Sequence, residues 1–114
     1  MVHVYGIKNC GSVKKALQFL DTKHIPYTFH DFKSSPVSHE VIQDWVKRSD
    51  ILRLFNTKGT TYRTLELKAL NLDEHGKIEW MAKENRLIKR PVIETDTDLI
   101  VGFDLHQYEG IFNS

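Results

Sequence analysis

Cysteine is nearly absent from this chain of 114 residues, which contains only Cys10. A single cysteine cannot close a disulfide within the chain, and it cannot supply a cysteine-rich zinc site. The six histidines also lack the short, regular spacing of metal-binding motifs. The sequence therefore predicts no metal and no bound cofactor, and the free thiol favours the reducing cytoplasm as the compartment.

Long hydrophobic runs are missing as well. No apolar segment approaches the roughly 20 residues that are needed to cross a bilayer. Residues 1–6 lack the basic stretch and the following apolar stretch of a signal peptide, and they favour a strand instead. We therefore expect a cytoplasmic protein without a membrane partner.

An excess of charge of either sign is also lacking, because 16 Lys and Arg stand against 15 Asp and Glu, a net charge of +1. This balance gives no overall attraction to nucleic acid, and we expect no nucleic-acid partner. Hydrophobic residues make up 40% of the chain and charged residues 27%, which is typical of a globular protein. The length predicts one domain over residues 1–114, and we expect a monomer.

The first part of the chain predicts a strand, a helix and a second strand. Residues 2–6 are apolar and favour a buried strand, and residues 27–32 have the aromatic and β-branched character of another. Between them, apolar residues recur at helical spacing. Ser12 is the expected N-cap of this helix, which should end near Lys23.

The middle of the chain predicts mainly helices. Ser38 should cap the first of them. A short helical turn is expected within residues 50–55, and the polar residues 56–63 favour a loop. Two further helices are expected over residues 65–70 and 77–84.

The end of the chain completes an α/β pattern. Residues 92–95 and 99–101 predict two strands close enough for a hairpin. Asp104 should cap a last helix, with Gln107 at the third helical position as in a capping box. The whole pattern predicts a thioredoxin-like fold: βαβ, a helical insertion at about residues 34–90, and ββα, forming a mixed four-stranded sheet.

Cys10 is the first candidate for chemistry, because it lies between a predicted strand and a helix N-terminus. The unpaired N–H groups and the helix dipole at such a place favour an anion, so the thiol pKa should be low. The alternative is a small buried hydrophobic residue.

The second candidate is Pro91, which opens a predicted strand. In thioredoxin-like domains a proline that is often cis faces the active-site cysteine at this position, and we predict a cis Arg90–Pro91 bond. The alternative is an ordinary proline at a strand start. Lys8, Arg63 and Arg90 are candidate cations for an anionic thiolate or substrate, although a single Arg is usually a solvated surface charge.

Four segments of this sequence resemble the family of arsenate reductases (ArsC) and Spx proteins, and they are most similar to its small YffB-like branch. The segments are YGIKNCGSVKKA at residues 5–16, NTKGTTYR at 56–63, IKRPVI at 88–93 and VGFD at 101–104. They occur in the order and spacing of the family, so the resemblance covers essentially the whole chain.

The resemblance implies a role for several residues. Cys10 would correspond to the cysteine that attacks arsenate in the reductases, whose adduct is resolved by glutathione with glutaredoxin. Arg90 would match the arginine before the proline, which helps to hold the oxyanion. Arg63 falls in the segment where the reductases carry another such arginine. Members of the YffB-like branch are thought to act on glutathione or glutathionylated thiols.

Two differences between this sequence and the family distinguish three hypotheses about its function. The reductases carry a late arginine, for which residues 101–104 offer no counterpart. Spx regulators bind the RNA polymerase α subunit and carry a CxxC switch, whereas Ser12 and Val13 follow Cys10 and Gly11 here. We therefore favour a glutathione-dependent thiol reductase with Cys10 as a monothiol nucleophile, with arsenate reductase and a non-catalytic Spx-like regulator as alternatives.

The expected ligand is glutathione or a glutathionylated thiol, with glutaredoxin as a possible protein partner. We expect the ligand to be bound by residues that flank the cysteine and the proline. These residues are Lys8, Asn9, Gly11, Ser12, Pro91 and Gly102.

Overall fold

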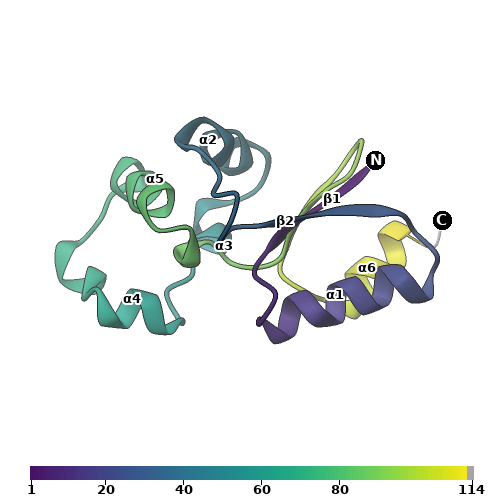
Figure 1. The fold of residues 1–114 in the computed structure, drawn as a ribbon. Helices are drawn as coiled ribbons and strands as arrows, with labels where there is room; N and C mark the ends of the chain where they lie inside the picture. Colours follow the sequence, from purple (N-terminus) through teal and green to yellow (C-terminus); the bar gives the residue numbers. More distant parts are fainter. Residues whose placement is uncertain (113–114) are drawn as a thin grey trace. The chain divides into compact units, whose positions relative to one another are not determined.

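The computed structural model describes residues 1–112, which form two compact units (Figure 1). Unit 1 combines Met1–His30 with the chain from Arg90 onward, and unit 2 comprises Asp31–Lys89. Unit 2 therefore lies where the sequence predicted an insertion over about residues 34–90. The single-domain organisation of the chain stays a prediction. No helix within residues 1–112 is long and apolar enough to span a membrane.

Unit 1 is built on a four-stranded mixed sheet with the strand order β2-β1-β3-β4. The elements are β1 (Val2–Gly6), α1 (Gly11–Thr22), β2 (Tyr27–Asp31), β3 (Val92–Glu94), β4 (Leu99–Val101) and α6 (Leu105–Phe112). β3 pairs antiparallel with both β1 and β4, with Ile93 opposite Val4 and Ile100. This is the thioredoxin-like arrangement that the sequence predicted.

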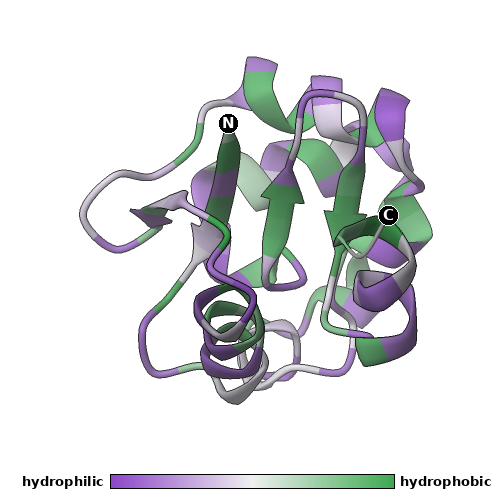
Figure 2. Ribbon diagram, turned by 90° about the vertical axis from the view of Figure 1, so that its right-hand side faces the viewer, coloured by the Kyte–Doolittle hydropathy of each residue, from purple (hydrophilic) through white to green (hydrophobic). Residues whose placement is uncertain are grey.

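The core of unit 1 lies between the sheet and the two helices α1 and α6, which cover the same face (Figure 1). Hydrophobic residues are concentrated along β3 and β4, whereas the helices alternate hydrophobic and polar positions (Figure 2). The buried cluster draws on five elements: Val4, Ala16, Phe19, Leu20, Ile93, Ile100 and Tyr108. The apolar stripe of the predicted helices and the apolar residues of the predicted strands therefore pack together in one core.

Unit 2 consists of short helices packed on one another. They are α2 (His39–Arg48), α3 (Ile51–Leu54), α4 (Thr60–Thr64), the 3₁₀ helices η1 (Leu67–Leu70) and η2 (Asn85–Leu87), and α5 (Glu74–Lys83). The buried Asn85 fixes the unit internally, because its side chain accepts a 2.7 Å hydrogen bond from the Val37 N–H and donates a 2.8 Å hydrogen bond to the Met81 carbonyl. A buried amide with both ends paired avoids the cost of an unsatisfied polar group.

The predicted helices of unit 2 are partly wrong. Ser38 caps α2 as predicted. Residues 56–63, expected as a loop, contain most of α4, which has no buried residue and so shows no hydrophobic period in the sequence. The expected helix 65–70 is only a 3₁₀ turn, and α5 begins at Glu74 rather than residue 77.

The Gly6 backbone at the end of β1 lies close to the Val13 side chain in the first turn of α1. A Cβ atom placed on Gly6 would lie 2.6 Å from Cγ2 of Val13, well inside van der Waals contact. Both residues are buried, and Val13 lies in the first turn of α1. Glycine at the end of β1 therefore lets Val13, in the first turn of α1, pack against the strand without overlap.

The sheet of unit 1 also carries a cluster of titratable side chains on β1, β2 and β3. Nδ1 of His3 lies 2.9 Å from Nε2 of His30, and the Tyr5 ring stacks on the His30 ring at 4.4 Å between centroids. Burial and the neighbouring His3 lower the pKa of His30, and the Glu94 carboxylate opposes this. Burial and a hydrogen bond to Glu94 raise the pKa of Tyr5 to about 12.

Replacing Gly6 with alanine should destabilise the protein, because the new methyl group overlaps Val13. Overpacking of this kind typically costs about 1–3 kcal/mol. Thermal unfolding measures the loss, and Gly110→Ala on α6, where a Cβ meets nothing within 4 Å, is the matched control. The loss should shrink in a Val13→Ala background. An equal loss in both backgrounds would show that the overlap is not its cause.

Acidification from pH 7 towards pH 5 should weaken the fold in part through His30. Its pKa in the folded state lies below the unfolded value of about 6.5, so the unfolded chain binds the proton more readily as the pH falls. His30→Gln should therefore show a shallower loss of stability over this range in urea unfolding. His106→Gln, on the exposed side of α6, should keep the wild-type slope. Identical slopes for wild type and His30→Gln would refute this assignment.

Candidate active site around Cys10

Cys10 is itself the N-cap residue of α1, with φ −93° and ψ 126°. Its N–H donates to the Ile7 carbonyl at 3.3 Å, and its carbonyl accepts the first helical hydrogen bond from the Lys14 N–H at 3.0 Å. The prediction that Ser12 caps this helix is wrong, because Ser12 is the second helical residue. Because of the tight turn that starts at Ile7, the N-cap of α1 is Cys10, two residues before the Ser12 that the sequence predicted.

The pKa of the Cys10 thiol lies below its ordinary value. Partial burial is the largest single influence and raises the pKa, because it penalises the charged form. Three groups stabilise the thiolate, and together they outweigh the effect of burial on the pKa. They are the Val13 N–H, the Arg90 side chain and the Ser12 N–H. The neutral thiol makes no capping hydrogen bond, so these N–H groups are available to the anion.

Arg90 precedes a cis peptide bond to Pro91, as the sequence predicted. Pro91 is buried, and its carbonyl accepts a 2.8 Å hydrogen bond from the Gly102 N–H. Gly102 has a φ of 84°, which glycine adopts without strain. Its carbonyl accepts a 2.7 Å hydrogen bond from the hydroxyl of the fully buried Tyr108. The segment that carries Arg90 is thus fixed to β4 and α6.

The role of Tyr108 was not evident from the sequence. Its place in the apolar stripe of the last helix indicated a core residue, and it is one. The hydrogen bond of its hydroxyl to Gly102 depends on how β4 and α6 pack, and nothing in the spacing reveals it. Both backbone groups of Gly102 are engaged inside the protein, and its contact to a ligand stays a prediction.

The other predicted binding residues occupy the turn before α1 and its first two positions. Lys8, Asn9, Gly11 and Ser12 are exposed there, next to the partly buried Cys10. Arg63 is exposed on α4 of unit 2, and its approach to the thiol stays a prediction. The structure therefore brings Cys10 and Arg90 together and surrounds the thiol with solvent-accessible residues.

Metal-ligating side chains do not gather in the part of the chain that the structure describes. Among residues 1–112, no three His, Cys, Asp or Glu side chains lie close enough to hold a metal ion. The chemistry that the site around Cys10 offers is that of a stabilised thiolate beside a guanidinium. Such a thiolate is a nucleophile towards disulfides and other electrophilic sulfur or oxyanion groups.

Known proteins resemble the chain over nearly its full length. The model of the ArsC family matches residues 5–111. A structure of a protein named YffB shares 36% identity, covers 96% of this chain and 97% of its own, and superposes with a TM-score of 0.90. An arsenate reductase (ArsC) related protein of Brucella melitensis shares 39% identity over 99% of this chain and 95% of its own, with a TM-score of 0.76. The global transcriptional regulator Spx of Listeria monocytogenes is 26% identical over 91% of this chain and 81% of its own.

Replacing Arg90 with glutamine should raise the pKa of Cys10, because the charge and the hydrogen bond that favour the thiolate are removed. The rate of iodoacetamide alkylation as a function of pH reports this pKa directly. The wild-type midpoint should lie below the ordinary value of about 8.5. Arg48→Gln on α2, which breaks a surface ion pair with Asp44, is the matched control and should leave the midpoint unchanged. A wild-type midpoint at or above the ordinary value would contradict the geometry.

Proposed function

Since this chain belongs to the ArsC family, we propose that it is a glutathione-dependent thiol reductase that uses Cys10 as a monothiol nucleophile. One observation supports the proposal above the others. Cys10 occupies the N-cap of α1 beside Arg90, so its thiolate is stabilised by backbone N–H groups and by a guanidinium. A stabilised thiolate is the reactive form in disulfide exchange.

The first step is attack of the Cys10 thiolate on the glutathione sulfur of a glutathionylated thiol. A bond forms between Sγ and the glutathione sulfur, and the original disulfide bond breaks. The substrate leaves as a thiolate and takes a proton from water. Arg90, which stabilises the thiolate, would contact the anionic groups during this exchange.

The second step requires a thiol from outside the chain, because the sequence has no second cysteine to resolve the mixed disulfide. The thiolate of a second glutathione attacks the glutathione sulfur on Cys10 and releases oxidised glutathione. The Cys10 thiolate is regenerated, and the net reaction reduces the substrate at the expense of one free glutathione thiol, because the second half of the oxidised glutathione was already disulfide-bonded to the substrate. The residues of the exposed turn, Lys8, Asn9, Gly11 and Ser12, together with Pro91, would hold the tripeptide during both steps.

Arsenate reduction is the second candidate, and the similarity to the ArsC-related protein of Brucella melitensis favours it. Arg90 beside Cys10 would suit an oxyanion, and Arg63 would supply a further cation. The chain has no arginine at residues 101–104, where the family resemblance implies one in the reductases. One cation fewer makes oxyanion turnover the weaker proposal.

Wild type incubated with a glutathionylated peptide and glutathione should release the free peptide thiol and oxidised glutathione. Cys10→Ser should lower the rate to that without protein, because a serine hydroxyl is far less nucleophilic at neutral pH. Intact-mass spectrometry should show one glutathione on wild type and none on the variant. Lys15→Gln, on the exposed side of α1, is the matched control and should keep the wild-type rate.

The same proteins incubated with arsenate and glutathione separate the two candidates. The thiol-reductase proposal fails if Cys10→Ser, folded by its melting curve, keeps its activity. It also fails if wild type oxidises glutathione only when arsenate is present and forms no glutathione adduct, since arsenate reduction then takes its place.

A further inference from the structure

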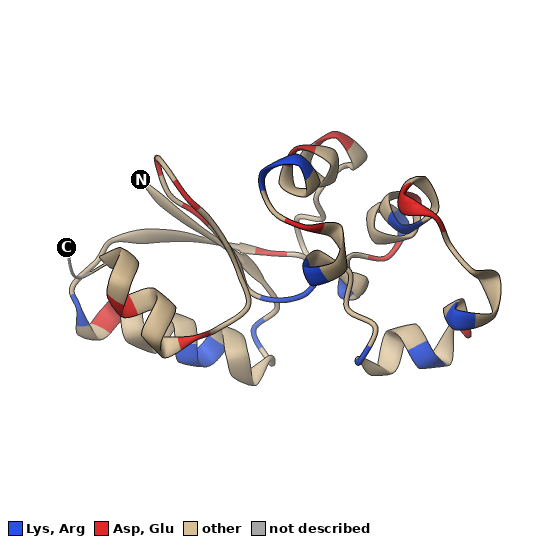
Figure 3. Ribbon diagram, turned by 180° about the vertical axis from the view of Figure 1, so that it is seen from behind, with Lys and Arg blue, Asp and Glu red and all other residues tan. Residues whose placement is uncertain are grey.

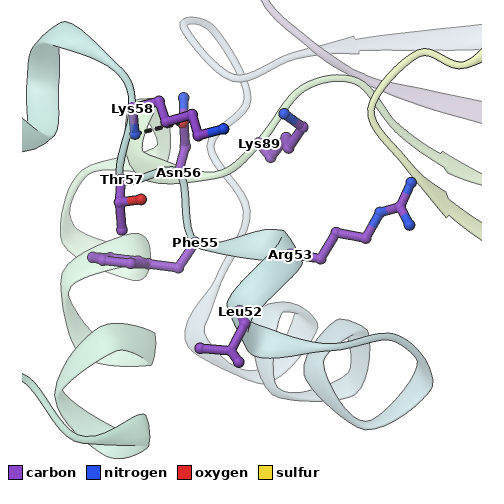
Figure 4. A pocket seen from close by; sticks show the side chains of 7 residues that line it. All are labelled: Leu52, Arg53, Phe55, Asn56, Thr57, Lys58 and Lys89. Carbon is purple, nitrogen blue, oxygen red and sulfur yellow. Dashed lines mark hydrogen bonds between the residues drawn. The ribbon is translucent and has the colours of Figure 1, made fainter.

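Unit 2 contains a pocket of about 370 Å³ whose lining is basic (Figure 4). Seven residues line it: Leu52, Arg53, Phe55, Asn56, Thr57, Lys58 and Lys89. Three of them are cationic and none is acidic, in a chain whose net charge is only +1. Acidic and basic residues are interspersed along the helices of this unit (Figure 3), so a lining of one sign is a local property of the pocket.

The backbone holds the two lysines of this pocket in place, although they lie far apart in the sequence. Phe55 forms an isolated antiparallel bridge with Ile88. The Lys89 N–H donates to the Leu54 carbonyl at 2.7 Å, and the Asn56 N–H donates to the Leu87 carbonyl at 2.8 Å. The Asn56 side chain then accepts a hydrogen bond from the Lys58 N–H at 3.1 Å (Figure 4). The backbone positions of Lys58 and Lys89 are therefore held by hydrogen bonds, and no ligand is needed to bring them together.

The positive charge of the two lysines is not neutralised within the described residues. Neither Lys58 nor Lys89 forms an ion pair with any residue from 1 to 112. Placing like charges around one pocket costs free energy through their repulsion, and a bound anion removes that cost. The pocket also offers apolar surface through Leu52, which is 75% exposed, whereas the Phe55 ring is buried and packs edge-on against Tyr62.

We propose that this pocket binds the oxyanion group, a phosphate or a carboxylate, of a small organic molecule whose apolar part packs on the exposed Leu52. Lys58 and Lys89 hold the anion by charge-assisted hydrogen bonds, and the Thr57 hydroxyl lies in the same lining as a further donor. None of these residues belongs to the thiol site, so the proposal is independent of the chemistry of Cys10.

Three probes of similar size test this site: phenyl phosphate, benzoate and the uncharged benzyl alcohol. Backbone ¹H–¹⁵N spectra of the full chain should show saturable shifts at residues 56–58 and at Lys89 with at least one of the two anions. Benzyl alcohol should cause none at the same concentration. The anion that binds more tightly tells whether the natural group is a phosphate or a carboxylate, and either result supports the proposal.

The double variant Lys58→Gln/Lys89→Gln should bind the preferred anion at least about tenfold more weakly, since two charge-assisted contacts are lost. The control Lys47→Gln/Lys68→Gln removes the same charge from exposed positions of unit 2 outside the pocket and should change the affinity less than about twofold, the scale of screened surface charges. Equal weakening in both double variants, saturable binding of benzyl alcohol, or shifts that never saturate with either anion would overturn the proposal.

Discussion

The contact of Gly6 with Val13 is the constraint on which the thiol site depends. A strand that ends in a residue without a side chain can lie directly against the first turn of α1. The chain between them is then short, and the turn from Ile7 brings Cys10 to the N-cap position. A larger residue at position 6 would overlap Val13 in the first turn of α1, the turn whose N–H groups favour the thiolate. The electrostatics of the site thus rest on a packing contact that involves no charge.

Two opposed effects decide the ionisation of Cys10. Partial burial disfavours the charged sulfur and is the largest single contribution. The N–H groups of the first turn and the Arg90 guanidinium prevail because they act together at the same atom. The segment that carries Arg90 is linked by hydrogen bonds, through Pro91 and Gly102, to the buried hydroxyl of Tyr108. The arginine that favours the Cys10 thiolate thus belongs to a segment held by contacts with β4 and α6.

Sequence patterns predicted the parts of the fold that bury apolar residues with a clear period. The strands and both long helices of unit 1 belong to this class, as does the helix that Ser38 caps. The same patterns failed to predict α4, which has no buried residue. They also predicted the wrong N-cap for α1, because the turn from Ile7 makes Cys10 the N-cap residue in place of Ser12. The candidate thiol and its arginine were found from position and resemblance, whereas the hydroxyl of Tyr108 and the pocket lysines depend on tertiary contacts that no local pattern records.

The division of the chain into two units separates these chemical features. Unit 2 begins at Asp31, the last residue of β2, and ends at Lys89, one residue before Arg90. Cys10, Arg90 and Pro91 all belong to unit 1, and the hydrogen bonds that fix them are made within that unit. The lysines of the basic pocket are held by the backbone of unit 2 alone. The hydrogen bonds of the N-cap turn, from the Cys10 N–H to the Ile7 carbonyl and from the Lys14 N–H to the Cys10 carbonyl, involve no residue that lines the pocket.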